Sequence, residues 1–309
     1  MKRVLITGGA GFIGSSLADK LAEREDMEIT IVDNLLTGDK RKIPNKDNVK
    51  FIKADVNNYE AMSSVFNVNG FDYVFHYAAV VGVKRTLENP IMVLDDIKGI
   101  ENVLKLSKNT GVKRVFFSSS SEVYGEPVEF PQNEETTPLN SKLPYAIVKN
   151  IGEAYFRSYE REFGLPYTIF RFFNTYGPKQ SKDFVISKFI ASALKKDDIT
   201  IYGDGSQTRT FCFVNDNVDA CLATLFENKN INDTLNIGSD VEMSILELAN
   251  KIIDITGSSS KIVHLPALKE GDMTRRHPDI TKMRKLLNRD LLPVEEGIKK
   301  ILEDTSYIL

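Results

Sequence analysis

The chain has 309 residues, of which 42% are hydrophobic and 27% are charged, as is ordinary for a soluble globular protein. The formal net charge of -3 argues against a general nucleic-acid binder, and no apolar run reaches the roughly 18 residues of a membrane span. Two cysteines make no disulfide framework in a chain this long, so we expect a cytoplasmic protein. Together with the charge and hydropathy, this predicts no nucleic-acid or membrane partner.

Short apolar runs alternate with amphipathic segments through the first half of the chain. The runs are rich in Val, Ile, Phe and Tyr and predict buried strands at residues 4–7, 28–33, 49–54, 73–78, 115–119 and 167–172. The segments between them predict helices at residues 15–25, 59–66, 90–110 and 145–163. This alternation predicts an α/β fold, a Rossmann-type doubly wound parallel sheet with helices on both faces.

After about residue 173 the rhythm breaks up into short strands between helices, which we expect at residues 184–195, 217–227, 244–256 and 294–303. This part is expected to form a smaller mixed α/β domain. The predicted boundaries give a Rossmann domain of residues 1–172, to which about 208–230 return, and a second domain of residues 173–207 and 231–309.

The first strand runs into a loop in which Gly8, Gly11 and Gly14 give the spacing GxxGxxG before a helix. Small residues let the backbone approach a pyrophosphate, and the N-terminus of the following helix favours its negative charge. Asp33 ends the second strand, where an acidic group accepts hydrogen bonds from an adenosine ribose and repels a 2′-phosphate. Residues 55–56 follow the third strand and are placed to meet the adenine. The pattern therefore predicts a site for NAD rather than NADP.

Tyr145 and Lys149 are spaced i, i+4, so on a helix they share one face. A lysine ammonium near a phenol favours the phenolate, which makes a tyrosine usable as a base near neutral pH. Ser120 lies at the end of the fifth predicted strand, where open parallel sheets place their ligands. Its hydroxyl is placed to bond a sugar hydroxyl beside Tyr145.

Several motifs together make the chain similar to the extended short-chain dehydrogenase/reductase family, the nucleotide-sugar epimerases and dehydratases. The resemblance runs from residue 2 to about residue 300, in the family's order. It rests on TGGAGFIG (7–14), VDN (32–34), HYAA (76–79), SSSSEVYG (118–125), PYAIVK (144–149), RFFNTYGP (171–178) and YGDGSQTRTF (202–211).

The resemblance implies an enzyme that keeps NAD tightly bound and acts on a UDP-sugar. In such enzymes the tyrosine removes a proton from a sugar hydroxyl while C4 gives a hydride to the nicotinamide, and a 4-keto sugar forms. The implied catalytic residues are Ser120, Glu122, Tyr145 and Lys149. The implied cofactor-binding residues are Gly8, Gly11, Phe12, Ile13, Gly14, Asp33, Asn34, Asp55, Val56, Ala78, Ala79, Ser118, Tyr145 and Lys149. The implied substrate-binding residues are Ser121, Asn174, Arg276 and, on the diphosphate, Arg209.

The family usually forms homodimers through the helices expected near residues 90–110 and 145–163, packed as a four-helix bundle. The first of these helices offers apolar positions that suit this contact or, equally, face the sheet: Ile100, Val103, Leu104 and Leu106. No metal is expected, because the histidines are scattered without metal-ligand spacing. His76, which ends a buried strand, is interpreted as a core residue.

Two features favour decarboxylation as the reaction. Glu122 follows Ser120 by two residues, and the sequence Ser-Glu-Val-Tyr-Gly looks like the pattern of UDP-glucuronate decarboxylases. The stretch TRRHPDITK (274–282) is similar to their Arg-x-Pro-Asp-Ile segment and places Arg276 where a uronic-acid carboxylate would be held. The alternatives are a solvated Glu122 and a helix-entry turn in which Asp279 caps a helix at 281–287.

Other features favour epimerisation or argue against one type of dehydration. AAVVGVKRTLENP (78–90) and PYAIVK (144–149) look like epimerases, and Ser121 replaces the Asp of TDP-glucose 4,6-dehydratases. The leading interpretation is a UDP-sugar 4-epimerase acting on a hexose or hexuronate; a UDP-glucuronate decarboxylase and then a nucleotide-sugar dehydratase are the alternatives. A UDP-glucuronate 4-epimerase would reconcile both sets of features. A dinucleotide-sensing protein without activity is the remaining class, but such proteins typically lose the tyrosine or lysine that this chain keeps.

Overall fold

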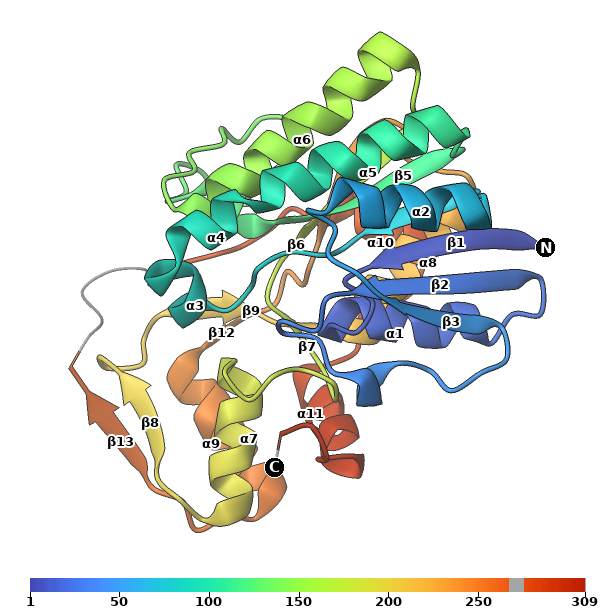
Figure 1. Cartoon of the computed structure of the whole chain (residues 1–309). Coiled ribbons are helices and arrows are strands. Elements are labelled where there is room, and N and C mark those ends of the chain that lie inside the picture. Colours follow the sequence, from blue (N-terminus) through green and yellow to red (C-terminus); the bar gives the residue numbers. More distant parts are fainter. Residues whose placement is uncertain (267–274, 309) are drawn as a thin grey trace. The chain divides into compact units, whose positions relative to one another are not determined.

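The computed structural model describes residues 1–266 and 275–308 (Figure 1). Internal contacts divide the chain into two compact units. The first unit consists of Met1–Gly125, Leu139–Arg171 and Cys221–Leu235. The second consists of Glu126–Pro138, Phe172–Ala220 and Asn236–Leu309. Each unit is described by itself below.

A seven-stranded sheet forms the centre of the first unit, in the order β11-β6-β5-β4-β1-β2-β3. The pairings among β1 to β5 are parallel, and β1 lies between β4 and β2, where the direction of the strand order reverses. The Rossmann-type fold is therefore confirmed. The strands are β1 (Lys2–Thr7), β2 (Met27–Asp33), β3 (Val49–Lys53), β4 (Tyr73–His76), β5 (Arg114–Ser120), β6 (Tyr167–Phe172) and β11 (Asp233–Ile237).

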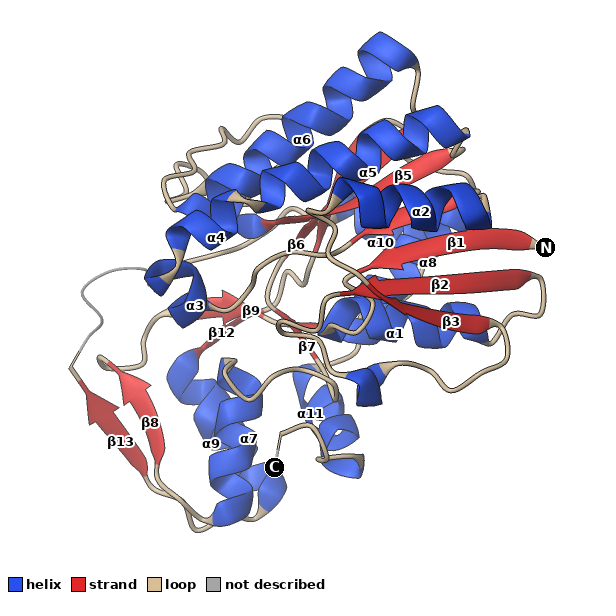
Figure 2. Ribbon diagram, viewed as in Figure 1, coloured by secondary structure: helices blue, strands red, loops and turns tan. Residues whose placement is uncertain are grey.

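Helices cover both faces of this sheet, because each buried strand presents apolar side chains alternately to the two sides. Figure 1 shows α2, α5 and α6 on one face and α1 on the other, and Figure 2 shows the strands side by side between them. The helices and short 3₁₀ turns are α1 (Phe12–Ala22), η1 (Lys40–Lys42), α2 (Tyr59–Asn69), α3 (Val83–Glu88), α4 (Pro90–Leu94), α5 (Asp96–Thr110), η2 (Ser121–Tyr124) and α6 (Pro144–Phe163).

Aromatic side chains fix the register of the central strands. Phe75, Phe116 and Phe170 stack across β4, β5 and β6, with ring centroids 4.3 Å and 6.1 Å apart. Phe117 is the next residue along β5, so its ring lies on the opposite face, where it stacks on Phe156 of α6 at 4.7 Å. A one-residue slip would exchange these two faces, so the packing specifies a single register.

The apolar positions of α5 belong to the core of this chain. Ile100, Val103, Leu104 and Leu106 are between 0% and 3% exposed, and they pack with Phe117 and its neighbours in one buried cluster. Of the two alternatives for these residues, the structure therefore shows the one in which they are buried within their own chain.

The helix expected over residues 90–110 is two helices, α4 and α5, with Asp95 between them, and α3 precedes them. Pro90 is the first residue of α4, a position where its missing N–H costs no helical hydrogen bond. Apolar periodicity alone does not mark such a break, because α4 and α5 carry apolar residues on both sides of Asp95.

The second unit contains pairs of short strands packed with helices. The pairs are β7 with β10, β9 with β12, and β8 with β13. A capping box at Ser244 and Glu247 begins α9. Its elements are β7 (Thr175–Tyr176), α7 (Val185–Lys195), β8 (Ile199–Tyr202), β9 (Thr208–Thr210), β10 (Cys212–Phe213), β12 (Glu242–Ser244), α9 (Ile245–Thr256), β13 (Ile262–Leu265), α10 (Thr281–Leu287) and α11 (Val294–Glu303), and α8 (Val214–Phe226) runs through both units. Within the described residues, no helix has the length and apolar character needed to cross a membrane.

Candidate active site

The opening loop packs so closely that side chains do not fit. Gly8 has a φ of +70°, and a Cβ added to it would lie 2.6 Å from the Ala78 amide nitrogen. A Cβ added to Gly14 would lie 2.5 Å from the Gly8 carbonyl oxygen. Among the described residues, no side chain caps α1 at Gly11, so the first N–H groups of the helix are available to an anion. This bare cradle at a helix N-terminus fits the pyrophosphate of a dinucleotide such as NAD.

Asp33 ends β2 beside this loop and is only 8% exposed. Its carboxylate accepts hydrogen bonds from the Ala10 amide at 3.1 Å and from the Leu35 amide at 2.8 Å. Burial raises its pKa, and these two backbone donors act in the opposite direction. The carboxylate is thus fixed where the loop and the second strand meet, the place expected for a ribose-binding acid.

Residues from the ends of β2 and β3 are joined directly. Asn34 Nδ2 donates to Asp55 Oδ2 at 3.0 Å, and Asp55 Oδ1 accepts from the Asn57 amide at 2.8 Å. Val56 is 9% exposed, and its carbonyl accepts from Asn102 Nδ2 at 2.9 Å. The residues predicted to meet an adenosine therefore form one connected group.

The loop after β4 is held from both sides. The Ala78 amide lies 3.4 Å from Thr7 Oγ1 of β1, and Ala79 is half-buried beside it. Asp96, the first residue of α5, accepts from the Val80 amide at 2.7 Å. Burial raises the pKa of Asp96 to about 6, while the nearby Lys149 charge lowers it. Asp96 could not be recognised from its sequence position, because an acidic residue at a helix start is explained by an ordinary favourable contact with the helix dipole.

Lys149 lies on the buried side of α6 and is 3% exposed. Its Nζ donates to the Ser118 carbonyl at 2.6 Å and lies 3.4 Å from Ser118 Oγ. The same Nζ is 5.7 Å from the centroid of the Tyr145 ring, so the two side chains share one face of the helix. Burial lowers the pKa of Lys149 to about 8, and Asp96 acts in the opposite direction.

The end of β5 continues into η2. Ser120 Oγ accepts from the Glu122 amide at 3.2 Å and thereby caps this short helix. Ser121 is 2% exposed, whereas Glu122 is half-buried. Lys149 binds Ser118, which lies two residues before Ser120, so the start of α6 is joined directly to the serine-rich end of β5.

The predicted substrate residues Asn174, Arg209 and Arg276 all belong to the second unit. Asn174 has a φ of +34°, and its buried Nδ2 has no hydrogen-bond partner within the described residues. A buried donor without a partner costs free energy unless a bound group accepts from it. Arg209 Nη1 donates to the Thr208 carbonyl at 2.8 Å.

Arg276 is 9% exposed and lies in a segment that is tied to the chain on both sides. Its neighbours Arg275 and His277 both contact Glu242, at 2.7 Å and 2.5 Å. The Thr281 amide donates to Asp279 Oδ1 at 2.9 Å, so Asp279 does support the start of α10, although Ile280 is the capping residue by its backbone angles. Thr274 of the same motif lies outside the described residues.

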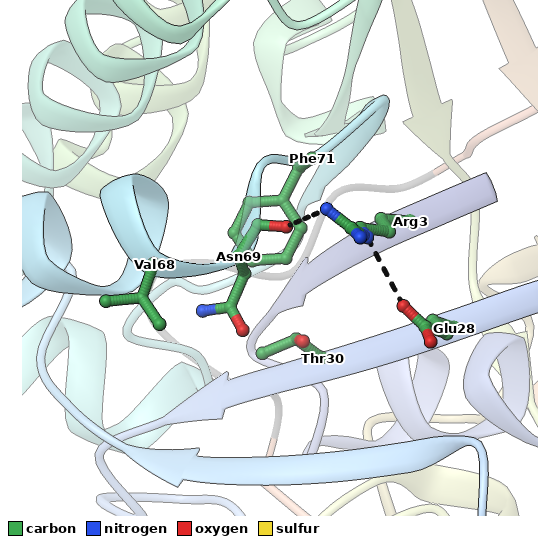
Figure 3. A pocket seen from close by; sticks show the side chains of 6 residues that line it. All are labelled: Arg3, Glu28, Thr30, Val68, Asn69 and Phe71. Carbon is green, nitrogen blue, oxygen red and sulfur yellow. Dashed lines mark hydrogen bonds and ion pairs between the residues drawn. The ribbon is translucent and has the colours of Figure 1, made fainter. Parts of the chain in front are cut away.

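Three further features lie apart from the candidate site chemistry. His76 is 1% exposed, contacts Thr7 Oγ1 at 2.8 Å through Nδ1, and has its pKa lowered by burial to about 3, as suits a neutral core histidine. In the described parts of the chain, no three His, Cys, Asp or Glu side chains gather as a metal-ligand set. A pocket lies at the other end of the sheet, where Arg3 binds Asn69 and Glu28 (Figure 3). None of the predicted site residues lines it.

The comparison with known families decides the classification. The model of the NAD dependent epimerase/dehydratase family matches residues 4–238. This chain belongs to that family. The match begins in β1 and ends just past β11, so it spans the whole central sheet that carries the glycine cradle and the β5–α6 group.

Relatives within the epimerase/dehydratase family differ in their reactions. The chain is 41% identical to a UDP-N-acetyl-alpha-D-glucosaminuronate decarboxylase of Bacillus cytotoxicus, over 98% of this chain and 97% of the relative. It is 34% identical to the Thermotoga maritima UDP-glucose 4-epimerase solved with UDP-glucose, with a TM-score of 0.91 over 97% of each chain. It is 28% identical to the Bacillus cereus UDP-glucuronic acid 4-epimerase solved with UDP-glucuronic acid and NAD, with a TM-score of 0.88 over 99% and 98% of the two chains.

Proposed function

We propose that this family member holds NAD in the glycine cradle and oxidises C4 of a UDP-sugar, with a UDP-hexuronate as its substrate. The observation that carries the proposal is the placement of Lys149 between Ser118 and the Tyr145 ring at the carboxyl end of the sheet, where open α/β folds bind ligands. Bound NAD would supply the acceptor for a hydride from the sugar carbon. The relatives solved with UDP-glucose, UDP-glucuronic acid and NAD support the same assignment.

The side chains of the first unit would accept and return the proton of the sugar C4 hydroxyl. Tyr145 takes the proton of the C4 hydroxyl as general base, and the Lys149 ammonium beside it stabilises the phenolate. The pKa of Lys149 is lowered by burial to about 8, so the amine is still mainly a cation at neutral pH. Ser120, fixed at the end of β5, orients the same hydroxyl.

Three further side chains, those predicted as substrate contacts, would bind the rest of the substrate. The guanidinium of Arg209 suits the diphosphate, because a planar fork with a permanent charge binds two phosphate oxygens at once. The buried Nδ2 of Asn174, which has no hydrogen-bond partner in the part of the chain that the structure describes, supplies a donor for a substrate oxygen. Arg276 would pair with the hexuronate carboxylate, because a guanidinium binds the two oxygens of a carboxylate as a planar fork.

Epimerisation at C4 is the product we place first. Once C4 is a ketone, return of the hydride to the opposite face of the sugar inverts the carbon, and the tyrosine gives its proton back. The two solved relatives named as 4-epimerases, one of them acting on UDP-glucuronic acid, support this outcome. Here Arg276 holds the carboxylate without loss of CO₂.

Decarboxylation is the second candidate, and the 41% identity with a UDP-hexuronate decarboxylase favours it specifically. A 4-keto hexuronate is a β-keto acid, so the bond from C5 to the carboxylate breaks with its electrons delocalised into the C4 ketone. Carbon dioxide leaves, and C5 must then be protonated. Glu122, half-buried two residues beyond Ser120, is the acid that this candidate assigns to C5.

The homodimer built on α5 and α6 stays a prediction. The buried apolar residues of α5 pack within their own chain, so any such contact would use the outer faces of these helices. α4 packs against α6 and exposes Ile91 and Met92, at 71% and 40%, which supports an apolar contact surface nearby.

Replacement of Tyr145 by phenylalanine tests the proposed function. Removing only the phenol hydroxyl should lower kcat by about 10²- to 10⁴-fold, the usual contribution of a general base, while substrate still binds. The matched control is Tyr159→Phe, which removes the same atom from the same helix beside Phe163 and should leave turnover unchanged. Equal turnover by the Tyr145→Phe variant and the wild type would show that the assigned base is wrong.

A further inference from the structure

An ion pair is fully buried on the side of α6 that faces the sheet. Glu153 is 0% exposed and Arg171 is 2% exposed. Arg171 Nε donates to Glu153 Oε1 at 2.9 Å, and Arg171 Nη2 donates to Oε2 at 2.7 Å, so the guanidinium binds the carboxylate as a two-pronged fork. Burial acts to raise the pKa of Glu153, but the hydrogen bonds and charge of Arg171 outweigh it and hold the pKa below its usual value.

Two neutral side chains connect this pair to the strand end. Ser119 Oγ of β5 donates to Glu153 Oε1 at 2.6 Å. Arg171 Nη1 donates to the hydroxyl of Tyr124, the last residue of η2, at 2.8 Å. One buried pair therefore joins four elements, α6, β6, β5 and η2, and Ser119 and Tyr124 are themselves 3% and 1% exposed.

The connected residues alternate with the proposed site residues along the chain. Ser119 lies between Ser118, which binds Lys149, and Ser120. Tyr124 lies two residues after Glu122, and Glu153 lies one helical turn after Lys149. Contacts that fix the positions of the connected residues therefore also restrict the positions of the neighbouring site residues.

The close approach of α6 to β5 allows Glu153 to contact Ser119. A Cβ added to Gly152 would lie 2.4 Å from the ring of Phe117, so α6 approaches β5 more closely than a larger residue would allow. The next residue of the helix, Glu153, can then reach Ser119, which lies on the same face of β5 as Phe117.

Stability alone is a weak reason for such a pair. Desolvation of two charges offsets much of their attraction, and apolar replacements of buried pairs are often as stable. What an apolar pair does not supply is a set of directed hydrogen bonds to Ser119 and Tyr124. These bonds fix distances between elements, which is what a site that moves protons needs.

We propose that the Glu153–Arg171 pair, acting through Ser119 and Tyr124, is a positioning device that holds Ser120 and Glu122 in place relative to Tyr145 and Lys149. This inference rests on the proposed C4 oxidation, because it assigns the pair a role in the geometry of that site. Glu153, Arg171, Ser119 and Tyr124 themselves are positioning residues and do not contact the substrate.

The test cuts the connection and leaves the ion pair intact. Ser119→Ala and Tyr124→Phe each remove one hydroxyl, and the double variant removes both. For the double variant we expect kcat on UDP-glucuronate to fall about 100-fold, the scale of a misplacement of about 1 Å, with KM within about twofold of the wild type. Thermal unfolding and circular dichroism check that the variants fold.

The matched control is Thr168→Val at the other end of the sheet. Thr168 is 0% exposed and bonds the buried guanidinium of Arg114, so this variant also removes a buried hydroxyl from a buried charge. It should lower the unfolding temperature without lowering kcat. A double variant that loses stability but keeps the kcat of the wild type would overturn the positioning role. Absence of turnover by the wild type on any UDP-sugar would overturn the proposed function and this inference with it.

Discussion

At the scale of single residues, the glycines of the opening loop are required by backbone contacts. Their spacing in the sequence predicted the loop, and the structure gives the reason for two of them, since Gly8 lies against Ala78 and Gly14 lies against Gly8. The contacts of Asp33 with Ala10 and Leu35 were not predictable, because amide partners depend on how the loop folds back over β2.

Gly14→Ala should weaken NAD binding. Its new Cβ would meet the Gly8 carbonyl oxygen at 2.5 Å, and backbone on both sides must shift, which distorts the cradle. We expect at least about a tenfold rise in the Kd for NAD, or about 1.4 kcal/mol, in titration calorimetry. The control is Gly164→Ala, at a φ of +67° with nothing within 4 Å, which should reduce stability and spare NAD affinity. Wild-type affinity in Gly14→Ala would contradict the cradle.

At the scale of elements, long periodic helices and buried strands were predictable, and short or interrupted ones were not. The bounds of β6 were predicted to the residue, because five of its six residues are β-branched or aromatic and the run follows Pro166. The strands β7 and β10 have two residues each, too few to show any period. The break between α4 and α5 matters more for the site, because it places Asp96 at a helix start beside Val80.

Asp96→Asn should stabilise the protein at neutral pH. The pKa of the folded-state carboxyl is raised by burial from 3.8 to about 6, so the native state binds the extra proton and stability falls as pH rises through this window. Asparagine mimics the protonated form and still accepts from Val80. The gain at pH 7.5 should approach about 3 kcal/mol as an upper bound, at 1.36 kcal/mol per pKa unit, and should nearly vanish near pH 4.

Urea denaturation at the two pH values measures this difference. The control is Asp95→Asn, one residue earlier, whose carboxylate is 48% exposed and pairs with Lys98 at 2.7 Å. It should show little pH-dependent gain, because an exposed ion pair contributes little to stability. An equal gain for Asp96→Asn at both pH values would mean that the buried charge is not the cause.

At the scale of the whole molecule, the order of strands and helices along the chain was easier to predict than which segments pack into the same unit. Ser120, Tyr145 and Lys149 come from the first unit in the region expected, since strand ends and helix faces follow from local pattern. Residues 126–138 join the second unit through contacts such as that between Gln132 and His277, which are 145 positions apart. No local pattern encodes a partner at that separation.

The buried pair of Glu153 and Arg171 shows the same limit at the site itself. Each residue taken alone looks like an ordinary charge on a helix or a strand end, and their fork-like contact appears only when α6 is laid on the sheet. The candidate site residues could therefore be named from motifs, whereas the contacts around them could not.

The most direct measurement is mass spectrometry, with chromatographic separation, of UDP-glucuronate after incubation with the purified protein and NAD. UDP-glucose and UDP-N-acetylglucosamine serve as parallel substrates. We expect conversion of the hexuronate to an isomer of unchanged mass that elutes as the C4 epimer. A product lighter by CO₂ would be consistent with oxidation at C4 and would show that the reaction is decarboxylation, not epimerisation. No conversion of any of the three sugars would contradict the central claim that this site oxidises C4 of a UDP-sugar.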